Sequence, residues 1–365
     1  MKAVVAIDSF KGSLSTFEAG EAAAKALELS GFSKKDITVL PMSDGGEGFC
    51  KVVGSYLSVS TVTQHIRGPF GGEIAAEYLL AGETAYIESA SACGYTLVSR
   101  DRLDPLAASS SGLGGLIRDA VRRGARRIVV GMGGTCTVDA GIGMLQALGA
   151  RFTLADGSIL PEGEPALMKE ILSMDTSAID LNGASIEAWS DTEVPMADAV
   201  RVFGRQKGLG EEMLGPASAW MGRAAALFGD SGIAGGGAAG GIGAALADVL
   251  GARIRSGADG IIDLSGLSEI NGVDLLITGE GRLDSQTLTG KLPARVAAAG
   301  RKSGCRHILC LAGSVELEGT GCFDSVLQTT PAGTPLSEAM VSAAANLTAA
   351  LSRRLQSKID INAQI

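Results

Sequence analysis

Short apolar runs recur along the chain, and each is followed by a polar loop and then by a segment with helical periodicity. The first run is 3–7 (AVVAI) and the second is 37–40. Apolar runs that do not alternate with polar residues are typical of strands buried in parallel sheets. Strands that alternate with helices indicate an α/β fold with helices on both faces of the sheet. The beginning of the chain therefore predicts a doubly wound parallel sheet.

The segments between these runs carry recognisable local signals. Ser15 and Glu18 have the spacing of a capping box, in which each side chain satisfies a backbone N–H of the first helical turn. The loop 41–48 (PMSDGGEG) then places two carboxylates, Asp44 and Glu47, among glycines before the next predicted helix. The loop after 3–7 and the loop after 37–40 both follow predicted parallel strands, so we expect them at the same edge of the sheet.

A further apolar run, Leu275–Ile277, predicts another buried parallel strand, which we expect to stop at Thr278–Gly281. The loop after it carries Glu280 and Asp284, and Lys291 precedes the next predicted helix. In open α/β sheets, ligands bind outside the carboxyl ends of the strands. A solvated loop with its charges facing water is the simpler alternative for any single loop of this kind. Repetition of the pattern favours a ligand site.

The character of the chain changes near residue 60. Residues 61–89 alternate between apolar and polar positions and contain glycine-rich turns, which predicts antiparallel strands. A chain of 365 residues is also longer than one average domain. We therefore predict two α/β domains, the first formed by 1–60 and 256–365 together and the second inserted as 61–255.

Composition excludes several classes of protein. Hydrophobic residues make up 46% of the chain, and the net charge of −9 argues against nucleic acid as a partner. No signal peptide is evident, and no window approaches the ~20 apolar residues of a membrane span. The six cysteines form no Cys-x-x-Cys pair, which disfavours a zinc site or a secreted disulfide framework. We predict a cytoplasmic protein with reduced thiols.

Histidine is scarce. His65 and His307 are the two histidines, and His307 opens an apolar strand, where an orienting or capping role is expected. A Ser-His-Asp hydrolase or a His-ligated metal site is therefore disfavoured. The chemistry should use carboxylates, lysines and hydroxyl groups.

Two glycine-rich segments are candidates for binding anions. The turn 133–135 (GGT) precedes a predicted helix, where exposed N–H groups and the helix dipole favour a phosphate, although a purely structural turn is equally compatible. The run 232–243 contains a formal G-x-G-x-x-G, but no strand precedes it, so a dinucleotide fingerprint is weak. We expect a flexible or phosphate-covering loop there, followed by a helix at 244–250.

Acids follow the strand-like segments repeatedly and lie near lysines and hydroxyl groups. Phosphoryl transfer needs hard oxygen ligands for Mg²⁺, cationic groups on the phosphates, backbone N–H donors and a carboxylate to accept the acceptor's proton. A dehydrogenase would need a convincing nucleotide fingerprint. A Mg²⁺-dependent phosphotransferase is therefore predicted from these acids and lysines: Asp8, Asp44, Asp139, Asp191, Glu280, Asp284, Lys11, Lys207 and Lys291.

Six motifs along the chain occur in the order seen in one known family: AIDSFKGSLS, PMSDGGEGF, GMGGTCTVDAGIGMLQALGA, FGRQKG, GGGAAGGIGAAL and LLITGEGRLDSQTLTGKLP. On these motifs the chain resembles the bacterial glycerate kinases of the glycerate 2-kinase type over essentially its whole length. The resemblance implies ATP-dependent, Mg²⁺-dependent phosphorylation of D-glycerate, usually on the 2-hydroxyl. It also implies two α/β domains, one flavodoxin-like and one of a restriction-enzyme-like type, with the ligand site in the cleft between them. The partners implied are ATP and a small hydroxy acid, with a homodimer as one open oligomeric state.

The matched positions, together with their chemistry, imply roles for individual residues. Catalytic roles fall on Asp8, Lys11, Asp191 as the candidate base, and Lys291. Metal binding falls on Asp44, Glu47, Glu280 and Asp284. Binding of substrate or nucleotide falls on Ser9, Gly45, Gly46, Gly133, Gly134, Thr135, Lys207, Gly237, Gly240, Thr278 and Gly279.

Several positions depart from the family pattern. The family usually has Asn where this chain has Val138 and Val194, Glu at Gly115, Arg at Leu103 and Pro at Arg205. Replacing Asn by Val removes both a hydrogen-bond donor and an acceptor at similar bulk. Two alternatives to a glycerate kinase therefore remain open: a paralogue that phosphorylates another small 2-hydroxy acid, and a non-catalytic paralogue that binds a small molecule.

Overall fold

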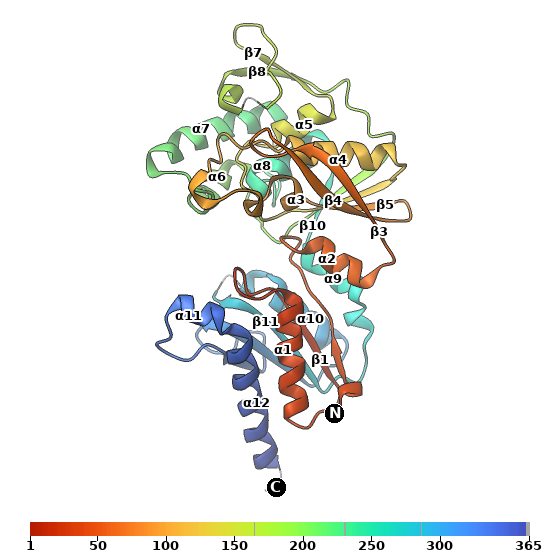
Figure 1. Cartoon of the computed structure of the whole chain (residues 1–365), viewed down its shortest axis with the longest axis vertical. Helices are drawn as coiled ribbons and strands as arrows, with labels where there is room; N and C mark the ends of the chain where they lie inside the picture. Colours follow the sequence, from red (N-terminus) through yellow and green to blue (C-terminus); the bar gives the residue numbers. More distant parts are fainter. Residues whose placement is uncertain (164, 230, 286, 363–365) are drawn as a thin grey trace. The chain divides into compact units, whose positions relative to one another are not determined.

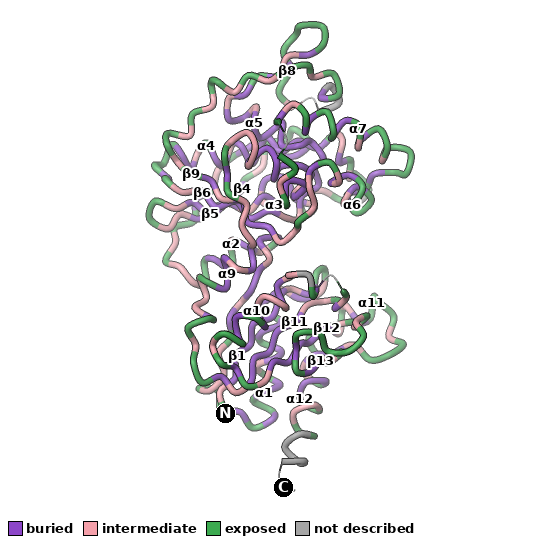
Figure 2. The backbone as a smooth tube through the Cα atoms, turned by 180° about the vertical axis from the view of Figure 1, so that it is seen from behind, coloured by how far each residue is buried: buried purple, intermediate pink, exposed green. Residues whose placement is uncertain are grey.

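The structure is a computed structural model that describes residues 1–163, 165–229, 231–285 and 287–362 (Figure 1). Contacts divide the chain into two compact units. The first unit comprises Met1–Asp44 and Ala258–Ile365, and the second comprises Gly45–Gly257. Each is an α/β structure with its own sheet and its own buried core, drawn in purple in Figure 2.

The first unit contains a five-stranded parallel sheet with the order β13-β12-β11-β1-β2. Numbered within the unit, the strands run 2-1-3-4-5, a common order in doubly wound sheets. Helices α1 and α12 pack together over one core, and α10 packs against β11 and β12. The elements are β1 (Ala3–Ile7), α1 (Thr16–Leu29), β2 (Ile37–Val39), α9 (Gly257–Ser265), β11 (Leu275–Leu283), α10 (Leu292–Lys302), β12 (His307–Val315), β13 (Ser325–Gln328), α11 (Leu336–Val341) and α12 (Ala343–Asn362).

The second unit contains a six-stranded mixed sheet with the order β10-β9-β6-β5-β4-β3. Strands β5, β6, β9 and β10 are parallel, whereas β3 and β4 pair antiparallel with each other and β4 with β5, as the alternation at 61–89 predicted. The elements are α2 (Phe49–Tyr56), β3 (Ser60–Arg67), β4 (Glu73–Ala81), β5 (Thr84–Glu88), α3 (Ser89–Cys93), α4 (Ser111–Arg122), β6 (Arg127–Gly131), α5 (Ile142–Leu148), β7 (Arg151–Leu154), β8 (Ile171–Asp175), β9 (Ser185–Trp189), α6 (Ala199–Phe203), α7 (Glu211–Phe228), α8 (Ala238–Ala244) and β10 (Arg253–Arg255).

Helix α2 does not lie in the unit to which the sequence prediction assigned it. The sequence prediction placed 1–60 in the first domain, whereas the contacts place α2 in the second unit. Phe49 explains this position, because its ring lies 5.7 Å from that of Trp189 and 6.3 Å from that of Tyr86. Burying this aromatic cluster ties α2 to β5 and β9.

Strand β11 is longer than the sequence predicted. We expected the strand to stop at Ile277, but it continues to Leu283, so Gly279 and Glu280 lie in the strand and not in a loop. The reason is the neighbouring strand β12, which pairs with β11 as far as Leu283. Gly279 fits this pairing because a Cβ there would lie 2.2 Å from the Leu311 carbonyl oxygen.

Three helical predictions are also corrected or confirmed. The capping box of Ser15 and Glu18 is present at the start of α1. The helix predicted at 336–356 is two helices, α11 and α12. The loop predicted at 232–243 is confirmed in most of its length, because Ala239, Gly240 and Gly241 have left-handed, non-helical backbone although α8 is assigned from Ala238, and a π-turn follows at 245–249.

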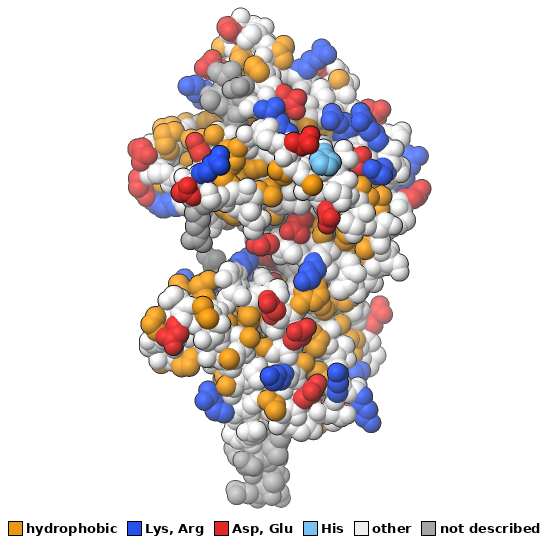
Figure 3. All heavy atoms as spheres, viewed as in Figure 1, with side chains coloured by type: hydrophobic (Ala, Val, Ile, Leu, Met, Phe, Trp, Pro, Cys, Tyr) orange, Lys and Arg blue, Asp and Glu red, His pale blue; other side chains and the backbone are white. Residues whose placement is uncertain are grey.

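Two properties of the surface bear on function. Among the described residues, no helix is both long enough and apolar enough to cross a bilayer. On the face seen in Figure 3, described Lys and Arg side chains are interspersed with Asp and Glu and do not gather in one patch.

Candidate active site

The carboxyl edge of the first unit's sheet brings together charged side chains that are far apart in the sequence. Asp8 follows β1, Asp44 follows β2, and Glu280 lies near the end of β11. Lys11 donates a hydrogen bond to Asp44, with 3.0 Å between Nζ and Oδ2. The predicted residues Asp8, Lys11, Asp44 and Glu280 therefore form one electrostatically coupled group.

Asp8 is the buried member of this group, with 7% of its surface exposed. Burial raises its pKa well above the ordinary value of 3.8, and the carboxylates of Asp44 and Glu280 add to the increase. Lys11 opposes this effect, as does the Ser9 backbone N–H, which donates to Asp8 Oδ1 at 2.7 Å. In turn, Asp44 raises the pKa of Lys11, which keeps the lysine charged. The group thus places Asp8, an acid with a raised pKa, beside the positively charged Lys11.

Glu280 connects this group to the loop after β11. Thr287 Oγ1 donates to Glu280 Oε1 at 2.6 Å, and the Asp284 backbone N–H donates to the same hydroxyl at 3.3 Å. Burial raises the pKa of Glu280, whereas Thr287 and Lys291 lower it. Lys291 Nζ lies 3.8 Å from Asp284 Oδ1. Sequence reasoning missed Thr287, although a hydroxyl residue three positions after an Asp was a usable signal.

The other residues predicted in this unit lie mostly inside the sheet. Thr278 is fully buried, and its hydroxyl has no hydrogen-bond partner among the described residues. Gly279 accepts the backbone N–H of Asp8 at 3.0 Å, which fixes the position of the acid at the end of β1. Ser9 is half-buried. These residues shape the edge through their backbone.

The carboxyl edge of the second unit's sheet is built from closely packed backbone. A Cβ at Gly133 would lie 2.7 Å from Gly46 Cα, and a Cβ at Gly45 would lie 2.5 Å from the Trp189 carbonyl oxygen. Ser89 Oγ accepts the Gly133 N–H at 3.2 Å. Glycine is required at these positions because any side chain would separate the segments. The predicted residues Gly45, Gly46 and Gly133 are thus brought together by packing.

Lys207 lies beneath this edge. Only 4% of its surface is exposed, and its Nζ donates to the Thr135 carbonyl oxygen at 2.6 Å and to Thr135 Oγ1 at 2.8 Å. The ammonium group also lies 5.8 Å from the centre of the Tyr95 ring. Burial lowers the pKa of Lys207 to about 8. Lys207 therefore holds the Gly134-Thr135 turn in place from below.

Asp191, the candidate base, follows β9 at the same edge. It is half-buried, and Ser256 Oγ donates to its Oδ1 at 2.6 Å. Glu47 is exposed, whereas Glu88 is half-buried and accepts the Gly48 and Cys50 N–H groups at 2.9 and 3.1 Å. Sequence reasoning missed Glu88, which caps the start of α2.

Asp139 has a different role from the one that its sequence position suggested. Its side chain is fully buried. Its carboxylate accepts the backbone N–H and the hydroxyl of Ser110, both at 2.7 Å, and the N–H groups of Gly141 and Gly143 at 3.1 and 3.3 Å. Burial nevertheless raises its pKa, since desolvation outweighs these bonds. Asp139 therefore joins the N-terminal ends of α4 and α5 and is not available as a reagent.

The glycine run also serves packing. Gly240 has a left-handed backbone, and a Cβ there would lie 2.1 Å from the Thr137 carbonyl oxygen. Gly237 donates its N–H to the Val194 carbonyl oxygen at 2.9 Å. Val138, one of the departures from the family pattern, is 2% exposed and belongs to the apolar core of this unit. A valine suits that position on packing grounds.

Metal binding is limited by how the acids are arranged. Within the described ranges, no group of three or more His, Cys, Asp or Glu side chains could hold a metal ion by itself. Mg²⁺, however, usually takes one or two carboxylates and completes its shell with water and substrate phosphates. The oxygen donors Asp44, Glu280 and Asp284 fit that partial role.

Comparison with known proteins identifies the family. The model of the glycerate kinase family matches residues 3–357. The chain belongs to the glycerate kinase family. It is 36% identical over 362 residues to a glycerate kinase of Bacillus subtilis strain 168, covering 94% of each chain. It is also 36% identical over 329 residues to a glycerate 2-kinase of Escherichia coli K12, covering 86% of each.

A solved structure agrees with this assignment. The crystal structure of a protein assigned as glycerate kinase 2 from Salmonella typhimurium LT2 superposes with a TM-score of 0.79 at 34% identity, covering 100% of both chains. The resemblance drawn from the motifs is confirmed, and the protein is a phosphotransferase of the glycerate kinase type. The α/β architecture with a parallel and a mixed sheet matches that structure.

Proposed function

We propose that this glycerate kinase transfers the terminal phosphoryl group of ATP to the 2-hydroxyl of D-glycerate with the help of Mg²⁺. The observation that carries the proposal is the charged group of Asp8, Lys11, Asp44 and Glu280 at one sheet edge. Phosphoryl transfer depends mainly on positioning and on neutralising charge, which such a group provides. The name of the E. coli relative supports the 2-hydroxyl as acceptor.

Several of the predicted residues have a chemical task in this reaction. The acceptor oxygen attacks the terminal phosphorus, ADP leaves, and Asp191 accepts the hydroxyl proton. Lys11 and Lys291 bind the phosphates through charge-assisted hydrogen bonds. Asp44, Glu280 and Asp284 would hold Mg²⁺, which neutralises charge on the phosphate oxygens when bound. Glu47, exposed on the second unit, stays a prediction as a further metal ligand.

The backbone at the edge of the second unit suits an anionic group. The Gly133-Gly134-Thr135 turn is held by Ser89 from one side and Lys207 from below, so its conformation is set before any ligand arrives. A preformed turn of backbone N–H groups binds a carboxylate or phosphate without an ordering cost. Gly46, packed against the same turn, and Gly45, packed against the Trp189 carbonyl oxygen, would serve the same ligand.

The test is ADP release with ATP, Mg²⁺ and D-glycerate, compared with L-glycerate and related 2-hydroxy acids. Phosphorus NMR of the product distinguishes 2-phosphoglycerate from 3-phosphoglycerate. Turnover on another acid and none on glycerate would instead favour the paralogue with a different substrate. Ligand-dependent stabilisation without turnover on any acid would favour a binding protein.

Asp191→Asn tests the assignment of the base. The variant should lower kcat by about 10²–10⁴-fold while leaving acid binding, measured by thermal shift, largely intact. Glu193→Gln, at an exposed acid two residues away, is the matched control and should keep normal turnover. Equal losses in both variants would point to damage to the segment and not to a lost base.

A further inference from the structure

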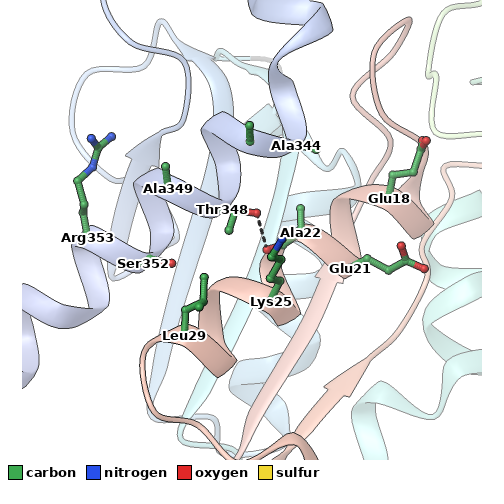
Figure 4. Close-up of a pocket in the computed structure, with 11 residues that line it drawn as sticks. Glu18, Glu21, Ala22, Lys25, Leu29, Ala344, Thr348, Ala349, Ser352 and Arg353 are labelled. Atoms are coloured by element: carbon green, nitrogen blue, oxygen red, sulfur yellow. Dashed lines mark hydrogen bonds between the residues drawn. The ribbon is translucent and has the colours of Figure 1, made fainter.

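Helices α1 and α12 lie side by side in the first unit and run in the same direction. Thr348 Oγ1 donates to the Ala22 carbonyl oxygen at 3.0 Å, and one turn later Ser352 Oγ donates to that of Ala26 at 3.5 Å. A groove of about 820 Å³ lies along this pair (Figure 4). Its walls come from both helices: Glu18, Glu21, Ala22, Lys25, Leu29, Ala344, Ala345, Thr348, Ala349, Ser352 and Arg353.

Helix α12 is apolar on two faces. Leu347 and Leu351 are fully buried in the core of the unit, whereas Ala345 and Ala349 are exposed on the groove. Leu29 of α1, which also lines the groove, is 61% exposed. A helix with apolar residues on both sides normally has a partner on each side. Small side chains such as alanine allow another helix to approach closely.

Charges are separated along the groove. Glu21 and Glu18 lie toward the ends where both helices begin, and Lys25 and Arg353 lie farther along, toward Leu29 (Figure 4). A two-fold axis across the groove would place the acidic end of one copy on the basic end of the other. The same axis makes the facing helices antiparallel, so that their dipoles attract. A partner that fits this pattern of charge is therefore a second copy of the chain.

We propose that the α1–α12 groove is the interface of a two-fold symmetric homodimer. The apolar walls supply the driving force, and the charges set the antiparallel orientation, because exposed ion pairs contribute little affinity on their own. Leu336 and Val341 of α11, 76% and 89% exposed, add apolar surface next to the start of α12. The proposal does not rest on the kinase reaction, and its test needs no substrate.

The first test is the mass of the full chain in solution, by sedimentation velocity and light scattering from micromolar to millimolar concentration. The wild-type chain should be a dimer, and Ala349→Arg should be a monomer, because a charged side chain then fills the groove. Leu172→Arg, at a 70% exposed position of β8, is the matched control and should remain a dimer. A wild-type monomer, or a dimeric Ala349→Arg variant, would overturn the proposal.

The second test uses the separation of charge. Glu21→Lys leaves the acidic end without net charge, because Glu18 remains there, and the double variant Lys25→Glu, Arg353→Glu makes both ends acidic. Each alone should self-associate several-fold more weakly than wild type, whereas an equimolar mixture should form a heterodimer. Equal association of each variant alone and of the mixture would reject the antiparallel arrangement. An equimolar mixture of the two variants that dimerises to the same extent as the wild-type protein would support this arrangement.

Discussion

The carboxyl edges of the two sheets of this kinase both lie at the ends of parallel strands, but they are built differently. In the first unit, the edge is made of charged side chains. Lys11 Nζ lies 3.0 Å from Asp44 Oδ2, and the carboxylates of Asp44 and Glu280 raise the pKa of buried Asp8. In the second unit, the edge is made of backbone, with Gly133 and Gly46 too close for any side chain between them. The first edge therefore presents charged side chains, and the second presents closely packed backbone.

The comparison shows that an acid after a strand has one of two roles, depending on its hydrogen-bond donors. Asp139 accepts four hydrogen bonds, three of them from backbone N–H groups, and holds two helix ends together. Asp8 accepts a neighbouring backbone N–H, and its surroundings are otherwise dominated by charged groups. An acid that is saturated by backbone donors is structural, whereas an acid among other charges can take part in chemistry.

Asp8→Asn, at the side-chain-built edge, should have the largest effect on activity. The variant removes the ionisable carboxyl group beside Lys11, so kcat should fall by about 10²–10⁴-fold if that group takes part in proton transfer. At neutral pH it should also stabilise the first unit by about 0.5–2 kcal/mol, because the buried carboxylate is disfavoured there by desolvation and by Asp44. Hydrogen exchange of the β1 and β11 amides measures this stability. Asp36→Asn, in the turn before β2, is the control and should change neither quantity.

The pH dependence of this stability follows from the raised pKa of Asp8. Folded Asp8 holds its proton at pH values where the unfolded chain, with a pKa near 3.8, has lost it. The folded state therefore binds more protons, and the contribution of Asp8 to stability falls as pH rises from 3.8 through its folded pKa. Asp8→Asn should lack this decline. A parallel pH dependence in both proteins would contradict the assignment.

Gly240→Ala should have the next largest effect, on the backbone-built side of the comparison. The new Cβ would meet the Thr137 carbonyl oxygen in a left-handed backbone, so the second unit should lose about 2–5 kcal/mol. Gly232→Ala is the matched control, with the same backbone region but open space around it, and should lose about 1 kcal/mol. Tryptophan fluorescence reports this unit alone, because Trp189 and Trp220 both lie in it. Equal losses would mean that packing at Gly240 is unimportant.

The sequence predicted those features of the fold that depend on neighbouring residues. Strands β1 and β2, the capping box of Ser15 and Glu18, and the antiparallel β3–β4 pair were all visible as local patterns. The end of β11 was not, because its extension past Ile277 depends on pairing with β12. A strand end that is fixed by another strand has no signal of its own.

The candidate site was predictable in its chemistry but not in its division of roles. Asp8, Lys11, Asp44 and Glu280 were all named from the sequence, and the structure brings them together. The burial of Lys207 was not foreseeable, because its partner Thr135 lies 72 residues earlier in the chain. Glycines that close-pack segments distant in sequence look the same in a sequence as glycines that bind phosphate.

Thr287 offers the finest test of the side-chain-built edge, with the smallest expected effect. Its hydroxyl donates to Glu280 at 2.6 Å and, in doing so, lowers the pKa of a carboxyl that burial otherwise raises. Thr287→Val keeps the buried volume and removes the hydroxyl, whereas Thr287→Ser keeps the hydroxyl and removes the methyl group. A hydrogen bond to a charged group contributes about 1.5–3 kcal/mol, so kcat/KM should fall about tenfold or more in the valine variant.

The pH profile separates this role from simple packing. Without the hydroxyl, Glu280 should bind its proton more tightly, so the acid limb of kcat/KM should move to higher pH in Thr287→Val and stay in place in Thr287→Ser. Lys291 and Lys11 oppose the shift, and Asp284 reinforces it, because these are the charged groups that act on Glu280. Equal losses in the two variants, with an unmoved acid limb, would show that Thr287 acts through packing. A shift in the valine variant alone would show that one buried hydroxyl keeps Glu280 ionised, as binding of a cation or a lysine requires.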